Sequence, residues 1–293
     1  MLSSLPKSPL ASRVDDWIKR LKSAVTAPCA VKDLYAGDHW SIARDLDGFQ
    51  ASAGGKVQLW VASAGYGLMG LDHQIQPYSA TFATQGPDSV VASVDKMTSV
   101  ESQRRWWQGL SRWPGPTPGQ PRSIAELAAQ WRRSPLIVAV SENYLHALRD
   151  DLWAARQELA NPKWLSVISA GSRRLEDLTE HLVPCDARLE VLVGGTRGSL
   201  NVRLARHALH ESHNKQLSLP VLRERFNVWM AQTPKTKTRH RKPLNDEQVQ
   251  AFIRKSLRRE PELRGTPMLR RLRDAGLACE YTRFMTLFRT LGE

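Results

Sequence analysis

Cysteine is scarce in this sequence. Its three cysteines, Cys29, Cys185 and Cys279, lie far apart among 293 residues and form neither a CxxC pair nor a Cys/His knuckle. A structural zinc site is therefore not expected. Because an odd number of widely spaced cysteines is unusual where disulfides form, the pattern favours a reducing compartment, and we predict a cytoplasmic protein.

Long apolar runs and the common nucleotide-binding loops are also missing. No apolar run approaches the roughly 18 residues that a membrane span needs, and the first residues, MLSSLPKSPLASR, lack the apolar core of a secretory signal. The glycine-rich segment 194–198 contains no GxGxxG and is not followed by GKS or GKT. This argues against a nucleoside triphosphatase and a dinucleotide-dependent enzyme, and we predict neither a cofactor nor a bound metal.

Acidic residues are outnumbered. The chain has 42 lysines and arginines against 29 aspartates and glutamates, which gives a net charge of +13 and a pI near 10.0. Such a surplus usually marks a polyanionic partner, of which nucleic acid is the commonest. We therefore expect the protein to bind nucleic acid; a basic surface that only aids solubility is the alternative.

Short apolar runs and amphipathic segments alternate through residues 1–232. The runs near residues 59, 136, 164 and 189 are typical of buried strands. Segments such as 12–24 and 88–112 carry the apolar stripe of a helix. The alternation predicts an α/β domain over residues 1–232, with a parallel sheet flanked by helices on both faces.

Each predicted strand ends in a polar turn. The strand near residue 59 leads into a glycine-rich turn and a loop with ionisable and aromatic side chains, namely Ser63, Tyr66, Gly67, Asp72, His73 and Tyr78. The strand near 136 ends at Asn143, and the one near 189 ends at Thr196 and Arg197. Because ligands bind beyond the carboxyl ends of parallel strands, we expect these side chains to share one pocket. For each segment taken alone, a plain turn without a ligand is the alternative.

Two further segments carry candidate side chains. KDLYAGDHW (32–40) places Tyr35 close to Asp38 and His39. Asp38 suits a helix N-cap, and a helix N-terminus also binds anions. QRRWWQGLSRW (103–113) interleaves aromatic residues with basic ones such as Arg105. That pattern suits contact with a nucleic-acid backbone, and packing with a basic rim is the alternative.

The composition changes at Thr233. Residues 233–243, TPKTKTRHRKP, hold five lysines or arginines and no acid, which is typical of a flexible basic linker. Residues 244–293 then have the pattern of three short helices. We expect the first to start at Asn245 with Gln248 as its capping partner, the second at Thr266, and the third near Glu280.

Three helices with a glycine-containing turn before the last are typical of a helix-turn-helix domain. The third would be the recognition helix and would present Arg283 to DNA. Lys242, Arg258 and Arg270 are further candidates for contacts with phosphates. A basic helical trio that only packs on the larger domain is the alternative.

The motifs KDLYAGDHW and LWVASAGYGLMGLDHQIQPY (59–78) resemble the paired motifs of the bacterial YaaA-like peroxide-stress proteins. The resemblance covers residues 28–82 well, weakens through the later strands and is absent from 233–293. The matching positions are Asp33, Leu34, Tyr35, Ser63, Tyr66, Gly67, Leu68, Ile75, Pro77 and Tyr78. This resemblance implies a uracil-DNA-glycosylase-like α/β domain that handles a base or a nucleoside.

Together with a DNA-binding tail, such a domain resembles the bacterial anti-phage DNA glycosylases. That resemblance implies flipping and excision of a modified base from phage double-stranded DNA, with glucosylated hydroxymethylcytosine as the best guess. Because no lysine stands out as a Schiff-base nucleophile, we expect a monofunctional enzyme that leaves an abasic site. A base-exchange enzyme acting on nucleic acid and a non-enzymatic DNA-binding regulator are the alternatives.

The glycosylase interpretation assigns a role to each candidate. Asp38 or Asp72 would stabilise the positive charge that develops on the sugar. His39 or His73 would donate a hydrogen bond to the departing base. The residues expected to stack on the base, read its edge or line its pocket are Tyr35, Ser63, Tyr66, Gly67, Tyr78 and Asn143. Those expected to hold a phosphate or a sugar are Thr196, Arg197, Arg105, Lys242, Arg258, Arg270 and Arg283.

Overall fold

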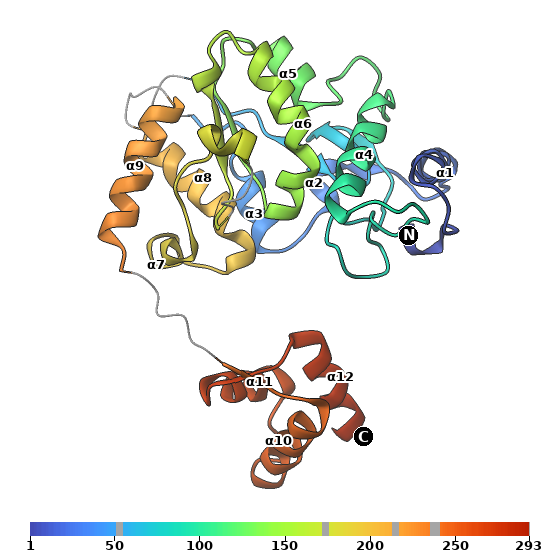
Figure 1. Cartoon of the computed structure of the whole chain (residues 1–293), viewed down its shortest axis with the longest axis vertical. Helices are drawn as coiled ribbons and strands as arrows, with labels where there is room; N and C mark the ends of the chain where they lie inside the picture. Colours follow the sequence, from blue (N-terminus) through green and yellow to red (C-terminus); the bar gives the residue numbers. More distant parts are fainter. Residues whose placement is uncertain (51–54, 172–175, 213–216, 235–240, 293) are drawn as a thin grey trace. The chain divides into compact units, whose positions relative to one another are not determined.

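The chain folds as two compact units, Met1–Pro234 and Lys235–Glu293. The computed structural model describes residues 1–50, 55–171, 176–212, 217–234 and 241–292 (Figure 1). Of the predicted linker, residues 235–240 lie outside the described residues. Its last two residues, Lys242 and Pro243, form a strand of the second unit, so the predicted linker end at 243 is too late.

The first unit mixes helices with short strands. Its α-helices are α1 (Leu10–Ser23), α2 (Val31–Leu34), α3 (Asp38–Arg44), α4 (Ser99–Arg112), α5 (Ile124–Gln130), α6 (Glu142–Glu158), α7 (Glu190–Val193), α8 (Leu200–His210) and α9 (Leu219–Gln232). Short 3-10 turns lie at Leu2–Ser4, Pro162–Trp164, Glu176–His181, Ala187–Leu189 and Arg197–Ser199. The α/β class predicted from the sequence is present in this mixed form.

The strands of the first unit pair two by two. β5 (Leu136–Ala139) runs parallel to β6 (Leu165–Ile168), and α6 connects them. β1 (Cys29–Ala30) pairs antiparallel with β4 (Gln74–Ile75), and β2 (Trp60–Ser63) pairs antiparallel with β3 (Gly67–Gly70). Among the described named strands of this unit, therefore, only β5 and β6 form the predicted parallel arrangement. The strand near residue 59 instead turns back on itself, because Gly67 adopts a φ of 78° that a residue with a side chain rarely takes.

The predicted strand near residue 189 is helical. Asp186 caps a turn at Ala187–Leu189 by accepting a hydrogen bond from the Arg188 amide, and α7 continues from it. Gly194, with a φ of 66°, then ends the helix. The apolar run misled the prediction because only part of it is buried: Leu189 has no exposed surface, whereas Val191 is 75% exposed.

The predicted helix over 88–112 begins only at Ser99. Residues before it are held in an irregular path by carboxylates that bind the amino-terminal segment. Asp95 accepts a hydrogen bond from the Leu10 amide at 2.6 Å, and Asp88 accepts one from the Ser3 amide at 2.8 Å. The Asp95 bond lies at the start of α1 and the Asp88 bond holds the turn Leu2–Ser4. Both compete with helix formation at 88–98.

Buried side chains from distant segments hold the turn between β2 and β3. The indole N–H of Trp17 in α1 donates to Gly65 O at 2.8 Å, and that of Trp106 in α4 donates to Ala64 O at 2.8 Å. The Arg122 guanidinium donates to Tyr66 O, to Leu68 O at 2.7 Å and to Trp113 O at 3.0 Å. Every main-chain carbonyl from residue 64 to 66 is thus bound by a side chain from elsewhere in the fold.

The described residues of the second unit, 241–292, form three helices and a two-residue parallel ladder. Its elements are β7 (Lys242–Pro243), α10 (Asp246–Arg259), α11 (Gly265–Asp274), β8 (Leu277–Ala278) and α12 (Tyr281–Gly292), and β7 pairs with β8. The predicted capping box of Asn245 and Gln248 is confirmed. The second helix starts one residue before Thr266, with Arg264 rather than Thr266 in the cap position.

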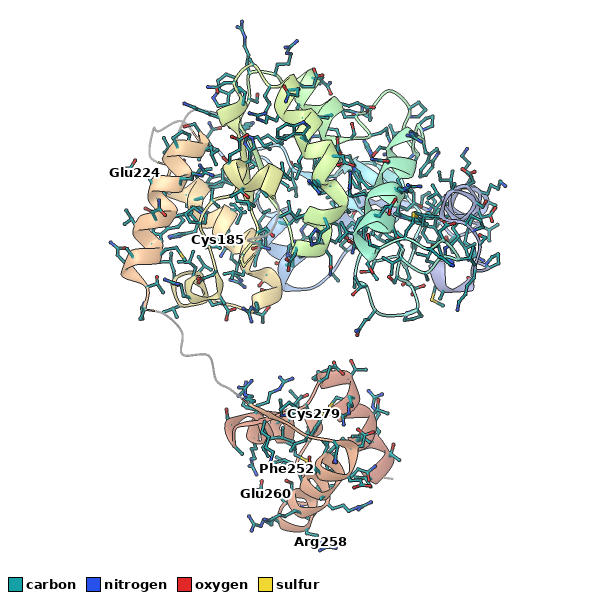
Figure 2. The ribbon with its side chains drawn as sticks, in the orientation of Figure 1. Cys185, Glu224, Phe252, Arg258, Glu260 and Cys279 are labelled. Carbon is teal, nitrogen blue, oxygen red and sulfur yellow. The ribbon has the colours of Figure 1, made fainter. Side chains whose placement is uncertain are left out.

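The core of this unit is small and apolar. It contains Val249, Ile253, Met268, Leu272 and Phe284, each with no exposed surface. Figure 2 labels Cys279, which is buried in the same core, and Phe252, which packs against it. The three helices therefore have a hydrophobic centre of their own, separate from that of the first unit.

Arg122 gives a test of how the β2–β3 turn is held. Replacing it in Arg122→Met leaves buried carbonyl oxygens without donors, and we expect the free energy of unfolding to fall by about 2–3 kcal/mol. The matched control is Arg112→Met at the exposed end of α4, where the change should stay within about 0.5 kcal/mol. Urea denaturation followed by tryptophan fluorescence measures both. Equal stability of the two variants would contradict a structural role for Arg122.

Candidate functional site

Three hydroxyl groups form a connected chain beside the β2–β3 turn. Ser63 Oγ lies 2.6 Å from Tyr78 Oη, which lies 2.7 Å from Tyr35 Oη. Ser63 Oγ also accepts hydrogen bonds from the amides of Gly65 and Tyr66, both at 3.1 Å. Since a serine hydroxyl has one proton and two lone pairs, Ser63 donates to Tyr78, and Tyr78 in turn donates to Tyr35. We call Ser63, Tyr78 and Tyr35 the hydroxyl chain.

Burial keeps the nearby phenols protonated. Desolvation is the largest cause of each shift: it raises the pKa of Tyr78 well above its ordinary value and the pKa of both Tyr66 and Tyr144 to about 12. At neutral pH these groups act as hydrogen-bond donors, and none of them serves as an ionised nucleophile. Phenols that stay neutral suit contact with an uncharged part of a ligand better than contact with a charged one.

Tyr66 is held as part of the fold. Its hydroxyl accepts from the Gln76 amide at 3.0 Å and lies 3.3 Å from Gln76 O. Its ring packs against Tyr78 and Trp113, with ring centroids 5.3 and 5.8 Å apart, and the residue is 2% exposed. The structure therefore leaves little of this ring for stacking on a base. Tyr35, another of the three predicted stacking tyrosines, lies at the end of the hydroxyl chain that is farther from Ser63.

Two side chains connect the ends of strands that are distant in sequence. The Tyr144 hydroxyl, in the first turn of α6, is bonded to the Ala64 main chain just beyond β2. Asn201 in α8 donates to Val140 O at 2.7 Å and accepts from the Ala170 amide at 2.9 Å. The carboxyl ends of β5 and β6 thus meet the start of α8, and the end of β2 meets the start of α6. Asn143, the predicted edge-reading residue, is half-buried beside Tyr144 at this junction.

Asp72 and His73 lie at the other end of the β2–β3 hairpin. The register pairs Ser63 with Gly67 at the turn and Trp60 with Gly70 at the far end, so four strand residues put about 10 Å between the two ends. Asp72 is exposed and forms an ion pair with Lys32 at 2.8 Å, which lowers the pKa of its carboxyl. The structure separates both residues from the hydroxyl chain.

Asp38 and His39 connect α3 to α8 and to the turn Arg197–Ser199 that precedes it. Asp38 is the first residue of α3, and Gly37, with a φ of 94°, takes the cap position that the sequence suggested for Asp38. Hydrogen bonds from Ser199 and Arg203 lower the pKa of the Asp38 carboxyl, so it is ionised at neutral pH. The Arg203 bond is 2.5 Å long. His39 Nδ1 lies 3.3 Å from Gly198 O.

Thr196 and Arg197 are exposed, and the structure shows another arginine at this turn. Arg197 is 80% exposed on its side chain and lies 3.9 Å from Glu190. Arg203, by contrast, is 16% exposed on its side chain and crosses the glycine turn at Gly195. Sequence reasoning missed Arg203. Basic residues at 203, 206, 207 and 210 have the spacing of one helix face, and this signal would have indicated the cluster.

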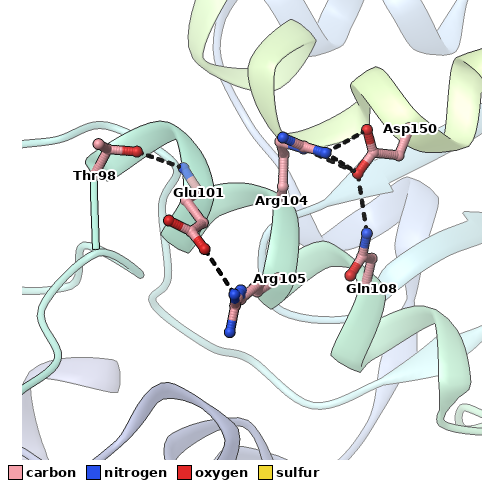
Figure 3. Close-up of polar contacts among 6 residues, drawn as sticks. All are labelled: Thr98, Glu101, Arg104, Arg105, Gln108 and Asp150. Atoms are coloured by element: carbon pink, nitrogen blue, oxygen red, sulfur yellow. Dashed lines mark hydrogen bonds and ion pairs between the residues drawn. The ribbon is translucent and has the colours of Figure 1, made fainter. Parts of the chain in front are cut away.

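Arg105 lies in a shallow hollow of about 340 Å³ at the start of α4. Figure 3 shows the polar contacts there: Arg105 pairs with Glu101 at 2.7 Å, and Arg104 grips Asp150 with two nitrogens. Gln108 donates to the same Asp150 carboxylate at 3.0 Å. Because the charges of this hollow neutralise one another, it offers little to a nucleic-acid phosphate.

The candidate cations of the second unit differ in their partners. Arg283 is bound by Asp246, with Nε 2.6 Å from Oδ1, and donates to Leu244 O at 3.0 Å. Lys242, Arg258 and Arg270 are exposed, and within the described part of the chain their side chains form no hydrogen bond or ion pair (Arg258 is labelled in Figure 2). These three cations are therefore available to a phosphate, whereas Arg283 first has to leave Asp246.

No family model, curated protein or solved structure matches this chain. The uracil-DNA-glycosylase-like architecture that the motif resemblance implies thus stays a prediction. Within the described ranges, no group of three or more histidines, cysteines, aspartates or glutamates is placed to hold a metal ion. In the same ranges, no helix has both the length and the apolar character of a membrane span.

Gly65 tests the packing of the hydroxyl chain. A Cβ at this position would overlap the ring of Tyr78. We expect Gly65→Ala to push that ring away, break the Ser63–Tyr78 bond and lower the free energy of unfolding by about 1–3 kcal/mol. Gly55→Ala is the matched control, since a Cβ there meets no atom within 4 Å. Chemical denaturation of both variants is the measurement, and a Gly65→Ala protein as stable as the control would show that Tyr78 is not confined.

Proposed function

We propose that the protein is a DNA glycosylase. In this proposal the second unit binds double-stranded DNA, and the first unit takes a flipped, modified base and cleaves its N-glycosidic bond. The products are the free base and an abasic site. The best candidate for the base is glucosylated hydroxymethylcytosine of phage DNA, which gives the protein a role in anti-phage defence. The resemblance of residues 28–82 to YaaA-like proteins supports the choice of chemistry.

The observation that carries the proposal is the charge of the second unit. Residues 235–293 hold 15 of the 42 lysines and arginines but only 7 of the 29 acidic residues, so +8 of the net charge of +13 falls there. The exposed cations of α10 recur at the spacing of one helix face: Arg254, Lys255, Arg258 and Arg259. A folded, basic three-helix unit of this kind supports binding to a polyanion.

The junction at the strand ends supports the chemistry. Cleavage of a glycosidic bond builds positive charge on the sugar, and an ionised carboxylate nearby stabilises that charge and orients the attacking water. Asp38 is ionised and exposed, and it lies three residues after Tyr35 of the hydroxyl chain. Its low pKa excludes the carboxyl as the proton donor to the base. The exposed His39 beside it is the candidate for that hydrogen bond.

One observation favours a second candidate function. Asp38 and Asp72, the two carboxylates considered for catalysis, both form ion pairs with basic side chains, Arg203 and Lys32. Pairs of this kind often serve structure alone. A DNA-binding regulator in which the first unit carries out no chemistry on DNA is therefore the alternative.

The glycosylase proposal predicts base release from modified DNA. Incubation with phage DNA containing glucosylated hydroxymethylcytosine, followed by alkali, should give free base and strand breaks, while unmodified DNA stays intact. Asp38→Asn should lower the rate by about 10²–10⁴-fold, because it removes the charge that faces the sugar. Asp72→Asn is the matched control: an exposed, ion-paired aspartate distant from the junction, expected to react at the wild-type rate.

Each other outcome points to a different function. If neither modified nor unmodified DNA releases a base or breaks after alkali, the glycosylase proposal is wrong and the DNA-binding regulator is favoured. Incorporation of an added free base without alkali-labile sites would favour base exchange. An Asp38→Asn protein that cleaves at the wild-type rate would remove Asp38 from the mechanism and leave the activity to other groups.

DNA binding by the second unit is tested by salt dependence. Arg258→Gln and Arg270→Gln should each weaken binding and reduce the slope of log K against log salt by about 0.9, because each loses one phosphate contact. Arg283→Gln is the comparison: its guanidinium is already bound to Asp246, so the slope should stay unchanged. Fluorescence anisotropy with labelled duplex DNA over a range of salt gives these values. Slopes of Arg258→Gln and Arg270→Gln that equal the wild-type slope would show that these arginines of α10 and α11 do not contact the phosphates.

A further inference from the structure

A small basic cavity lies where α7 packs against α8. It has a volume of about 280 Å³. Its lining consists of Leu192, Val193, Arg203, Arg206, His207 and His210. The last four residues are 203, 206, 207 and 210 of a single helix, and their spacing puts them on one face of α8. Two guanidinium groups and two imidazoles therefore converge on one cavity.

The charge of this cavity is not balanced by its own lining. None of the described residues that line it is acidic. Asp38 neutralises Arg203 from outside through the ion pair at 2.5 Å, while Arg206 makes no ion pair or hydrogen bond within the described residues. Arg206 as a residue is half-buried, and none of its nitrogens is among the fully buried atoms that lack a partner, so solvent or a ligand can reach its donors. The lining therefore favours an anion.

Three of the four basic side chains are held in position. Arg203 crosses Gly195, where a Cβ would collide with its guanidinium, and its Nε donates to Ser199 Oγ at 3.1 Å. The His207 ring packs on Trp229 with centroids 4.6 Å apart. The His210 ring packs on Phe49 with centroids 4.5 Å apart. Because these groups are already oriented, a ligand binds with little further loss of side-chain conformational entropy.

The hollow at Arg105 provides an internal comparison. It is of similar size, about 340 Å³, and also contains two arginines. There, however, Glu101 and Asp150 occupy both guanidinium groups (Figure 3). Of these two hollows, the one at α8 has no carboxylate in its lining, and its Arg206 has no partner among the described residues.

The remaining wall suggests the shape of the ligand. Leu192 and Val193 of α7 form an apolar side, and Leu192 is 40% exposed. The cavity is smaller than the roughly 300–1,000 Å³ of pockets for drug-sized molecules. A phosphate group fits the basic side, since arginine offers paired N–H donors in the geometry that phosphate oxygens accept. A sugar attached to that phosphate would face the apolar side.

We propose that this cavity binds the phosphate group of a nucleotide, with Arg206 and Arg203 as the main donors and His207 and His210 as supporting ones. The phosphate belongs either to a free nucleotide or to a DNA strand. The proposal stands on the lining of the cavity and is independent of glycosylase activity.

Isothermal titration calorimetry of the full chain tests the site. Inorganic phosphate and a nucleoside 5′-monophosphate are titrated at constant ionic strength set with chloride. Arg206→Gln and His210→Gln should each weaken binding of both anions by about tenfold, the effect of losing one hydrogen bond to a charged group. Arg133→Gln is the control. Arg133 is an exposed arginine between α5 and β5 that lines neither hollow, and this variant is expected to bind as the wild type does.

Two results would overturn the proposal: no binding of either anion to the wild type beyond that of chloride, or unchanged affinity in Arg206→Gln and His210→Gln. If Arg206→Gln lowers the melting temperature but leaves the affinity unchanged, the second result holds, and Arg206 contributes to stability alone.

Two further measurements decide whether the phosphate belongs to a free nucleotide or to a DNA strand: the affinity for a nucleoside monophosphate relative to inorganic phosphate, and the affinity of Arg206→Gln for duplex DNA. A nucleoside monophosphate that binds at least tenfold more tightly than inorganic phosphate, with unchanged duplex affinity in Arg206→Gln, supports a free nucleotide. A loss of duplex affinity in Arg206→Gln that equals its loss for inorganic phosphate supports a DNA strand. Base excision that persists while anion binding fails would overturn the cavity proposal and leave the glycosylase proposal intact.

Discussion

The first unit depends on the side-chain hydrogen bonds to the main-chain carbonyls of the β2–β3 turn. Trp17, Trp106 and Arg122 come from three separate segments, and each donates to a main-chain carbonyl of this turn. A tight turn buried in a core has carbonyl groups that strand pairing does not satisfy, and leaving them unbound is costly. Burial lowers the pKa of the Arg122 guanidinium to about 10, which still leaves it charged at neutral pH. The turn in this way acquires a fixed shape, and with it the position of Ser63.

The candidate site follows from that fixed turn. Ser63 orients Tyr78, and Tyr78 orients Tyr35, through hydroxyl bonds of 2.6 and 2.7 Å. Asn201 joins the ends of β5 and β6 to α8, so the polar turns of distant segments meet without a continuous sheet between them. Side-chain hydrogen bonds perform here the positioning that ladder bonds perform in a larger parallel sheet. On the same helix, Arg203 binds Asp38 and also lines the basic cavity.

Charge is distributed differently in the two units. In the first unit most cations near the candidate residues have a partner: Arg104 has Asp150, Lys32 has Asp72, and Arg203 has Asp38. In the second unit the cations outnumber the acids. Arg271 has Glu260, but the exposed Arg258 and Arg270 stay without a partner in the described residues. Paired charges set local geometry, whereas unpaired ones attract a polyanion. This division is consistent with one unit that positions groups and another that holds nucleic acid.

The sequence by itself determined the features that depend on local pattern. The α/β class, the helices α1 and α10, the Asn245–Gln248 capping box and the basic excess of the second unit all follow from neighbouring residues. Only the tertiary structure decided which of the candidates meet. Asp72 follows Ser63 by nine residues yet lies at the opposite end of the hairpin, because Gly67 reverses the chain. Arg203 reaches Asp38 across 165 positions, a pairing that depends on how α3 packs on α8 and that no local pattern encodes. The apolar run at Glu190–Val193 is likewise decided by the tertiary structure. Such a run forms a strand only where a neighbouring strand is present to pair with it, and here it forms α7.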